Sequence, residues 1–354
     1  MEQRPVTIND VARAAEVSVA TVSRVLSGGS ASAAARERVV AAAREMGYRR
    51  QAPERKGDSA AVRALALVIS DLTNPYYSML CAGAEQAARE AGRPLIVYQP
   101  EAGRRGEDTM ADAILELNAC GAVLVGAPVE TGTAEEIRRR LLKISQRMPI
   151  VTIGPRVEGV SCVNITSDLS VSVRKSIAHL VALGHRRIAF VGGMGGMRSS
   201  SARRRAYFEE MERLGLPIDR QVSTESAHTP QGGELCANRL FSETQPGQRP
   251  TAVIAINDLV ALGALRQLQR MGIRVPEDVA LIGCDNQFFT PYLNPPLTTV
   301  DLHPFDHGVS AIGELIGALD GGSQASYSQI RECSLIVRES CGALLGVRSM
   351  REGV

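Results

Sequence analysis

The stretch VTINDVARAAEVSVATVSRVL, residues 6–26, predicts two short helices joined by a tight turn. Apolar residues repeat at the spacing of one helical face on both sides of a break at residues 16–18, so both helices face one small core. Thr7 and Ser18 precede these stripes, and each hydroxyl is able to accept an amide hydrogen bond as an N-cap. The second helix is therefore expected to begin at about Val19. The stripes consist of Ile8, Val11, Ala12 and Ala15, and of Val22, Val25 and Leu26.

Two helices in this order are typical of a helix-turn-helix unit, in which the start of the second helix contacts base edges of DNA. Val19 and Ala20 offer only apolar contact, for example to a thymine methyl group, whereas Arg24 is able to pair with guanine through two hydrogen bonds. The other DNA-binding candidates are short hydroxyl residues, which position a helix on phosphates without selecting sequence: Thr7, Ser18, Thr21 and Ser23. A helical hairpin that packs against a partner protein is the alternative explanation of the pattern.

Length and composition predict a protein of two or three domains that does not cross a membrane. The 354 residues exceed one compact core, and the 44% apolar residues include no unbroken apolar run of about 18. No secretory segment opens the chain, so we expect a cytoplasmic location. The seven cysteines are widely scattered without a metal-ligand spacing, which predicts free thiols and neither metal nor cofactor. Residues 1–60 hold ten Arg or Lys against seven Asp or Glu, so a modest basic excess accompanies the proposed DNA reader.

The segment that follows the two helices completes an N-terminal domain. Residues 32–46 predict a third helix that Ser32 caps and Gly47 ends. We expect a three-helix headpiece over residues 1–48. The polar residues 49–61 contain Pro53 and Gly57 and predict a hinge or linker.

Beyond residue 62, short apolar runs alternate with amphipathic stretches, which predicts an α/β fold with parallel sheets covered on both faces. The runs span residues 64–70, 94–99, 121–127, 149–154, 187–193, 251–257 and 279–285. The helical stretches span residues 78–91, 134–146, 169–183, 203–214 and 259–271. A break near Val160 predicts two similar lobes over residues 62–340. The expected boundaries are about 62–160 and 291–320 for the N-lobe, about 161–290 and 321–340 for the C-lobe, and 341–354 for a C-terminal tail.

Ligands of doubly wound sheets bind outside the carboxyl ends of the strands, so the residues that follow the apolar runs are candidates for a binding site. They are Asp71, Asn74, Tyr76 and Tyr77 after the first run, residues 194–200 after the fifth, Asn257 and Asp258 after the sixth, and Asp285 and Asn286 after the seventh. We expect polar groups from both lobes to close around one small solute.

Several motifs in this order resemble the lactose-repressor (LacI/GalR) family of bacterial transcription regulators. The resemblance runs from about residue 6 to about residue 340. It rests on residues 6–26, RERV (36–39), GY (47–48), NPYY (74–77), GHRRIAFVGG (184–193), INDLVALGALRQLQRMGIRVPEDVALIGCDN (256–286) and NPPLTTV (294–300). It implies a homodimer that reads a pseudo-palindromic operator and a core, similar to periplasmic sugar-binding proteins, that takes a sugar or sugar-acid effector in its cleft.

The resemblance also implies the effector-binding residues. They are Tyr76, Tyr77, Arg198, Ser200, Asn257 and Asp285. Asp285 and Asn257 suit sugar hydroxyls, tyrosine rings suit the C–H surface of a sugar, and Arg198 suits a carboxylate or phosphate. Structural roles are the alternatives, because Tyr76 and Tyr77 sit where a helix closes on the core and Arg198 where a side chain faces solvent. Asp258 is expected to be the N-cap of the following helix.

Two positions depart from the family pattern. Where the family has a hinge helix whose leucine wedges into the minor groove, this chain has Pro53 and Gly57. This predicts either a weaker operator kink than in the family or another residue as the wedge. Glu16 stands where the family often has glycine, and a positive φ there costs about 1 kcal/mol. The tail, residues 341–354, lacks sustained heptads, which argues against a tetramerising coil.

Two other functions compete with a repressor. GGMGGMR, residues 192–198, follows a strand as a phosphate-binding turn does, but it lacks the third glycine of that motif. The five histidines show no nucleophile–base pattern, so we expect no enzyme. A transport-type solute-binding protein needs a signal peptide and no headpiece. The effector, its sign as inducer or corepressor, the operator, and the choice between dimer and tetramer stay open.

Overall fold

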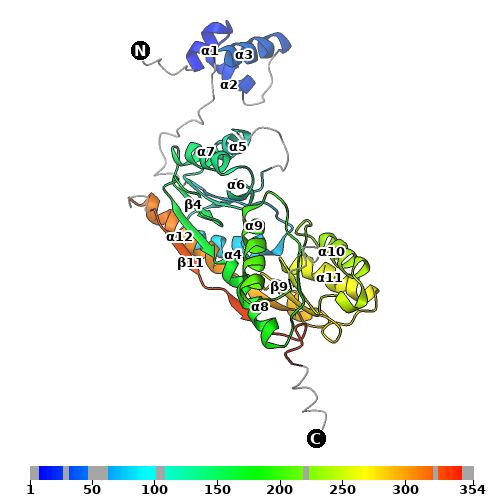
Figure 1. Ribbon diagram of the computed structural model, residues 1–354. Coiled ribbons are helices and arrows are strands. Elements are labelled where there is room, and N and C mark those ends of the chain that lie inside the picture. Colours follow the sequence, from blue (N-terminus) through cyan, green and yellow to red (C-terminus); the bar gives the residue numbers. More distant parts are fainter. Residues whose placement is uncertain are drawn as a thin grey trace. The chain divides into compact units, whose positions relative to one another are not determined.

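A computed structural model describes residues 8–26, 32–46, 63–100, 108–217, 223–321 and 326–344. Contacts divide the chain into two compact units, residues 1–61 and 62–354 (Figure 1). Each unit has its own apolar core. The predicted hinge at residues 49–61 lies outside the described residues, as do Thr7, Gly47 and the chain beyond residue 344.

The N-terminal unit contains helices α1 (Ile8–Ala14), α2 (Val19–Leu26) and α3 (Ala33–Glu45), as predicted. Their apolar faces meet in one small core. Ser18 caps α2, because its Oγ lies 3.2 Å from the amide nitrogen of Thr21, and Ser32 Oγ similarly accepts from Ala35 at 3.3 Å. Glu16, in the turn between α1 and α2, has φ 51°, the left-handed conformation that favours glycine. The core consists of Val11, Ala12, Ala15, Val22, Val25, Val39, Ala42 and Ala43.

The first sheet of the second unit is parallel throughout and defines the N-lobe. Its strand order is β11-β5-β4-β3-β1-β2. Its strands are β1 (Leu65–Val68), β2 (Leu95–Tyr98), β3 (Gly121–Val125), β4 (Ile150–Ile153), β5 (Val163–Ser167) and β11 (Ser328–Arg331). Successive residues of β1 face opposite cores, which explains its continuous apolar run. One core includes α4 (Pro75–Glu90) and α12 (Pro304–Leu319), and the other includes α5 (Asp108–Glu116) and α7 (Ala134–Ser145). The short α6 (Ala127–Glu130) follows β3.

The second sheet defines the C-lobe and has the order β12-β10-β9-β8-β6-β7. Its strands are β6 (Ile188–Val191), β7 (Ser223–Thr224), β8 (Ala252–Ala255), β9 (Ala280–Cys284), β10 (Thr298–Asp301) and β12 (Ser334–Ile336). Only β12 of these is antiparallel to its neighbour, β10. Helices α8 (Leu169–Ala182) and α9 (Arg198–Arg213) contact each other, as do α10 (Pro230–Glu243) and α11 (Asp258–Arg270), and the two pairs flank this sheet (Figure 1). The described part of this lobe also contains the 3₁₀ turns η2 (Pro246–Gln248) and η3 (Thr290–Tyr292).

The predicted lobe boundaries were wrong in three places, because strand pairing assigns three strands to the other lobe. β5 was placed in the C-lobe but pairs with β4, and β11 was placed there but pairs with β5. β10 was placed in the N-lobe but pairs with β9. The chain therefore crosses between lobes after β5, after β10 and between β11 and β12. The error arose because the sequences of β5, VNITS, and β11, SQIR, are too polar to show an apolar run.

Candidate effector cleft and nucleic-acid interface

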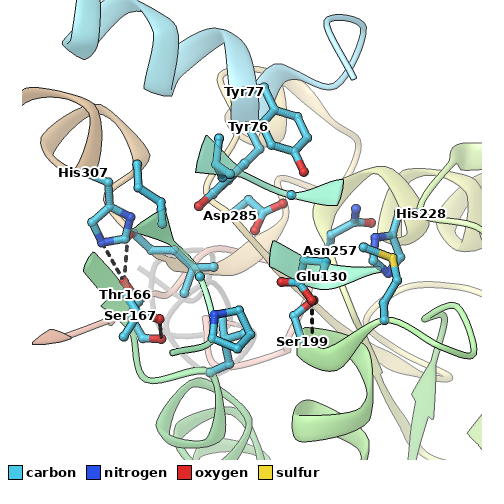
Figure 2. A pocket seen from close by; sticks show the side chains of 18 of the residues that line it. Tyr76, Tyr77, Glu130, Thr166, Ser167, Ser199, His228, Asn257, Asp285 and His307 are labelled. Atoms are coloured by element: carbon cyan, nitrogen blue, oxygen red, sulfur yellow. Dashed lines mark hydrogen bonds between the residues drawn. The ribbon is translucent and has the colours of Figure 1, made fainter. Parts of the chain in front are cut away.

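A cleft lies between the two lobes, and side chains from both lobes line it (Figure 2). It holds about 720 Å³ of space outside the protein atoms, a figure that includes space open to solvent. Its walls include residues that follow β1, β6, β8 and β9, where the sequence placed the site. The ends of β3, β4 and β5 also line it, and the sequence had not singled these out. Its polar lining residues include Tyr76, Tyr77, Glu130, Ser167, Ser199, Arg203, His228, Asn257, Asp285 and His307.

The C-lobe wall contains Asp285 and Asn257, as predicted. Asp285 directly follows β9, with φ 110°, and is 6% exposed. Burial raises the pKa of Asp285, and the nearby Arg203 guanidinium opposes that rise. Asn257 is the N-cap of α11, since its Oδ1 lies 2.9 Å from the amide nitrogen of Val260. That bond uses the side-chain oxygen, so the amino group is the part of Asn257 that suits a ligand acceptor.

Asp258 was expected to cap α11, and this prediction was wrong. Asp258 is the first helical residue, and its carboxylate accepts hydrogen bonds from the Gln287 amide at 2.8 Å and the Thr299 hydroxyl at 2.6 Å. It therefore ties α11 to the segment after β9 and to β10. Asp258 thus stabilises the segment that contains Asp285, although Asp258 does not itself line the cleft.

The N-lobe wall contains Tyr76 and Tyr77 at the start of α4, with their rings in an edge-to-face arrangement at a centroid distance of 5.3 Å. Asn74 Oδ1 caps the helix by accepting from the amide of Tyr76 at 3.0 Å. Both rings also pack on the N-lobe core, as the structural alternative expected, and the same residues line the cleft, so ligand contact stays a prediction. Burial raises the pKa of both phenols, that of Tyr77 to about 12, so both are neutral hydrogen-bonding groups at pH 7.

Arg198 and Ser200 do not line the cleft among the described residues, although both were candidates. The Arg198 guanidinium donates across the lobes to the backbone carbonyls of Val129 at 3.2 Å, Pro155 at 3.0 Å and Arg156 at 2.6 Å. Ser200 Oγ lies 3.2 Å from His228 Nε2. The neighbouring Ser199 lines the cleft instead.

Ser199 and Glu130 form a second link between the lobes, because the Ser199 amide donates to Glu130 Oε2 at 2.9 Å (Figure 2). Glu130 ends α6 and is 6% exposed. Its burial raises the pKa of the carboxyl, while the Ser199 hydrogen bonds and the charge of Arg203 lower it. Gln287 Nε2 and Asn74 Oδ1, 3.2 Å apart, join the lobes at another point.

The sequence did not single out Glu130, Arg203, His228 or His307 as site residues. Arg203 lines the cleft from α9 and donates to the backbone oxygen of Ile256. Burial lowers the pKa of His228 and of His307 to about 4, so both imidazoles are neutral at pH 7. These side chains come from separate elements that meet only in the folded core, and their spacing in sequence carries no signal of that meeting.

The residues of α2 that the sequence singled out for base contacts are exposed in the N-terminal unit. Val19 is 41% exposed, and Ala20 and Arg24 are also exposed. Thr21 Oγ1 lies 2.8 Å from Ser18 Oγ, so these two hydroxyls sit together at the N-terminus of α2. The side chain of Ser23 lies outside the described residues.

None of the described helices combines the length and hydrophobicity that crossing a lipid bilayer requires. No three His, Cys, Asp or Glu side chains within the described ranges are placed to bind a metal ion. The fold and the cleft thus define a class of two-lobed binding proteins joined to a helix-turn-helix domain.

Comparison with known families agrees with this class. The family described as bacterial regulatory proteins, lacI family, matches residues 7–51, and the periplasmic binding protein-like domain matches residues 177–341. The HTH-type transcriptional repressor CytR of Escherichia coli (strain K12) is 30% identical over 344 residues, which cover 97% of this chain and 98% of that protein. The chain belongs to the lacI family of bacterial regulatory proteins.

Two solved structures share the fold. The transcriptional regulator CelR in complex with cellobiose is 28% identical with a TM-score of 0.69, over 95% of this chain and 100% of that one. The lac repressor dimer bound to operator and the anti-inducer ONPF is 25% identical with a TM-score of 0.70, over 96% of this chain and 99% of that one.

Proposed function

We propose that this protein is a transcription repressor whose affinity for an operator is controlled by a small neutral sugar in the cleft between its lobes. The observation that carries the proposal is the cleft, because polar side chains of both lobes line it. The chain also belongs to the lacI family. A relative named as a repressor and solved relatives with operator or cellobiose support it. Regulation of this kind needs no chemical step, and we assign no enzymatic activity.

On the DNA side, we propose that α2 enters the major groove and that Arg24 reads a guanine, with Val19 and Ala20 in apolar contact. Ser18, Thr21, Ser23 and Thr7 would hold phosphates. The lac repressor relative is a dimer on its operator, which supports a homodimer and a pseudo-palindromic site for this chain.

A neutral sugar suits the cleft better than a sugar acid. The expectation of an acid rested on Arg198, which does not line the cleft and donates three hydrogen bonds to backbone carbonyls. Arg203 is the remaining guanidinium among the described lining residues, and the carboxyls of Asp285 and Glu130 interact with it. An anionic ligand would meet those two acidic groups, whereas hydroxyls are able to bond to both acids and the guanidinium.

Selection from random duplexes with the full-length protein tests the DNA half. We expect one enriched pseudo-palindromic sequence, and Arg24→Ala is expected to lose about 1–3 kcal/mol of binding free energy and to relax preference at one base pair per half-site. Arg13→Ala, an exposed arginine at the end of α1, is the matched control for charge. Equal losses on every sequence for both variants would refute the role of Arg24.

Thermal unfolding in the presence of sugars tests the effector half. Cellobiose, D-ribose and other neutral sugars are compared with cellobionic acid and ribonic acid, because a ligand that binds only the folded state raises Tm. We expect stabilisation by a neutral sugar and none by its acid. Stabilisation by the acid alone would overturn the neutral class.

A further inference from the structure

His307 is a histidine at the cleft whose ring has one buried nitrogen without a partner among the described residues. It lies in the first turn of α12, is 1% exposed and lines the cleft. Figure 2 shows it at the opposite end of the pocket from His228, with Asp285 between them. Its Nε2 lies 3.2 Å from Ser167 Oγ, while its Nδ1 is buried without a hydrogen-bond partner among the described residues.

The hydrogen bonds around Ser167 decide which ring nitrogen carries the proton. Ser167 Oγ lies 2.9 Å from the backbone oxygen of Leu302, and a carbonyl oxygen only accepts, so the serine hydrogen points to Leu302. Toward His307 the same oxygen acts as an acceptor. Nε2 of His307 therefore carries the proton and donates to Ser167.

The second ring nitrogen is then a bare acceptor. Burial, together with the charge of Arg331, lowers the pKa of His307 to about 4, so the ring holds a single proton at pH 7. With that proton on Nε2, Nδ1 has a free lone pair. An unsatisfied buried acceptor costs free energy, and in native proteins such groups almost always have a partner from the protein, water or a ligand.

Neither the Ser167 hydroxyl nor the Thr166 hydroxyl donates to His307 Nδ1. Ser167 is committed to Leu302, and the Thr166 hydroxyl donates to the backbone oxygen of Ser167 at 3.1 Å. At another part of the lining, Arg203 Nε is a buried donor that also lacks a partner within the described chain. His307 and Arg203 both line the cleft, and each has one buried nitrogen without a partner among the described residues.

We propose that His307 Nδ1 accepts a hydrogen bond from a hydroxyl or N–H group of the effector and so determines effector specificity. The proposal rests on the proposed function, because it takes the cleft to be the effector site. It requires a neutral ligand with a donor at the His307 end, which a sugar hydroxyl supplies. A ligand with an ether oxygen or a methyl group at that point would be rejected.

The protonation state is tested first, without any ligand. Long-range ¹H–¹⁵N NMR of histidine-labelled full-length protein distinguishes a protonated from an unprotonated ring nitrogen, and His307→Gln assigns the signal. We expect protonated Nε2 and unprotonated Nδ1 at pH 7. A proton on Nδ1, or on both nitrogens, overturns the proposal.

The ligand contact is tested with cellobiose and its monodeoxy analogues, by calorimetric titration of the wild type, His307→Phe and His307→Gln. We expect His307→Phe to bind cellobiose about tenfold more weakly and His307→Gln, which keeps an acceptor, to retain part of the affinity. One deoxy analogue should bind the wild type about tenfold more weakly than cellobiose does. On His307→Phe the same analogue should bind as well as cellobiose, because both changes remove the same hydrogen bond. If, for every hydroxyl, the affinity lost on removing it and the affinity lost in His307→Phe multiply, then water, and not the effector, satisfies Nδ1.

The outcomes separate this proposal from the proposed function. Cellobiose binding with no effect of either variant would keep the effector cleft and refute the role of His307. If no sugar in the panel binds, the sugar effector is refuted, and the NMR result alone decides whether Nδ1 is an acceptor. Ligand-free Tm and circular dichroism of each variant establish that it is folded.

Discussion

At the scale of single residues, burial keeps the two cleft imidazoles uncharged, and this makes stability depend on pH. The pKa of His228 and of His307 is about 4 in the folded chain against about 6.5 in an unfolded one. Between these values the unfolded state binds more protons, so stability is lost as the pH falls from about 6.5 to 4. The buried carboxyls of Asp285 and Glu130 act in the opposite direction, because their pKa is raised on folding.

A comparison of variants isolates the histidine contribution. Four charged or titratable groups shift the pKa of His307 beyond burial: Arg331 and His303 lower it, and Asp306 and Asp301 raise it. When the pH falls from 7 to 4.5, the free energy of unfolding should decrease less in His307→Gln than in the wild type. The two decreases should differ by about 2–3 kcal/mol. Urea unfolding at the two pH values measures this, with the half-buried His179→Gln as a control for which a smaller difference is expected. Identical pH dependence in wild type and His307→Gln would contradict a neutral His307.

At the scale of elements, α4 and α12 approach each other through glycines. A Cβ at Gly83 would lie 2.0 Å from the backbone oxygen of Phe305, and one at Gly308 would lie 2.1 Å from that of Leu80. Backbone atoms at these distances must move, so only glycine permits the contact. The packing of α12 on α4 in turn places His307 and both tyrosines at the cleft.

Gly83→Ala should therefore destabilise the protein by about 1–3 kcal/mol through overpacking. Gly313→Ala is the matched control on α12, since a Cβ there meets nothing within 4 Å. That change should stabilise by about 0.5–1 kcal/mol, because glycine is the poorer helix former. Chemical denaturation measures the change in unfolding free energy for both variants. No loss of stability in Gly83→Ala would show that the two helices separate easily.

The elements that sequence predicted are those with a strong local pattern. All seven apolar runs are strands, and residues 134–146 and 259–271 correspond closely to α7 and α11. β5 and β11 were missed because they are polar, and β10 was assigned to the wrong lobe because pairing between distant segments leaves no local signal.

In the cleft, too, the residues with a local sequence signal were predicted and those without one were not. Asp285, Asn257, Tyr76 and Tyr77 follow strands directly, and the cleft contains all four. Arg198 was misplaced because its three carbonyl partners come from the other lobe, which sequence spacing does not reveal. Among the cleft histidines, His307 becomes informative only once its hydrogen bonds are known.

At the scale of the whole core, the two lobes are held together by contacts beside the cleft. Arg198 donates to three N-lobe carbonyls, and the Ser199 amide to Glu130. Loss of the guanidinium would leave the carbonyls of Pro155 and Arg156 to water and favour an open arrangement. Effector affinity would fall, because the ligand would have to close the lobes at its own cost in free energy.

Arg198→Ala should accordingly speed hydrogen exchange of the Ser199 amide by about tenfold or more and weaken sugar binding by a similar factor. Arg213→Ala is the control, since this arginine of the same helix pairs with Glu210 at 2.6 Å within the C-lobe. Exchange mass spectrometry with and without sugar reports the difference. Equal protection of Ser199 in both variants would mean that Arg198 does not hold the lobes closed.

Control of DNA binding by the cleft is tested most directly by the affinity of the full-length protein for its selected operator, with and without the sugar that raises its Tm. We predict a change of about tenfold or more in the wild type, in either direction, and none in Asp285→Ala, whose cleft lacks the acceptor. An operator affinity that the bound sugar leaves unchanged in the wild type would contradict the central claim that the cleft controls DNA binding.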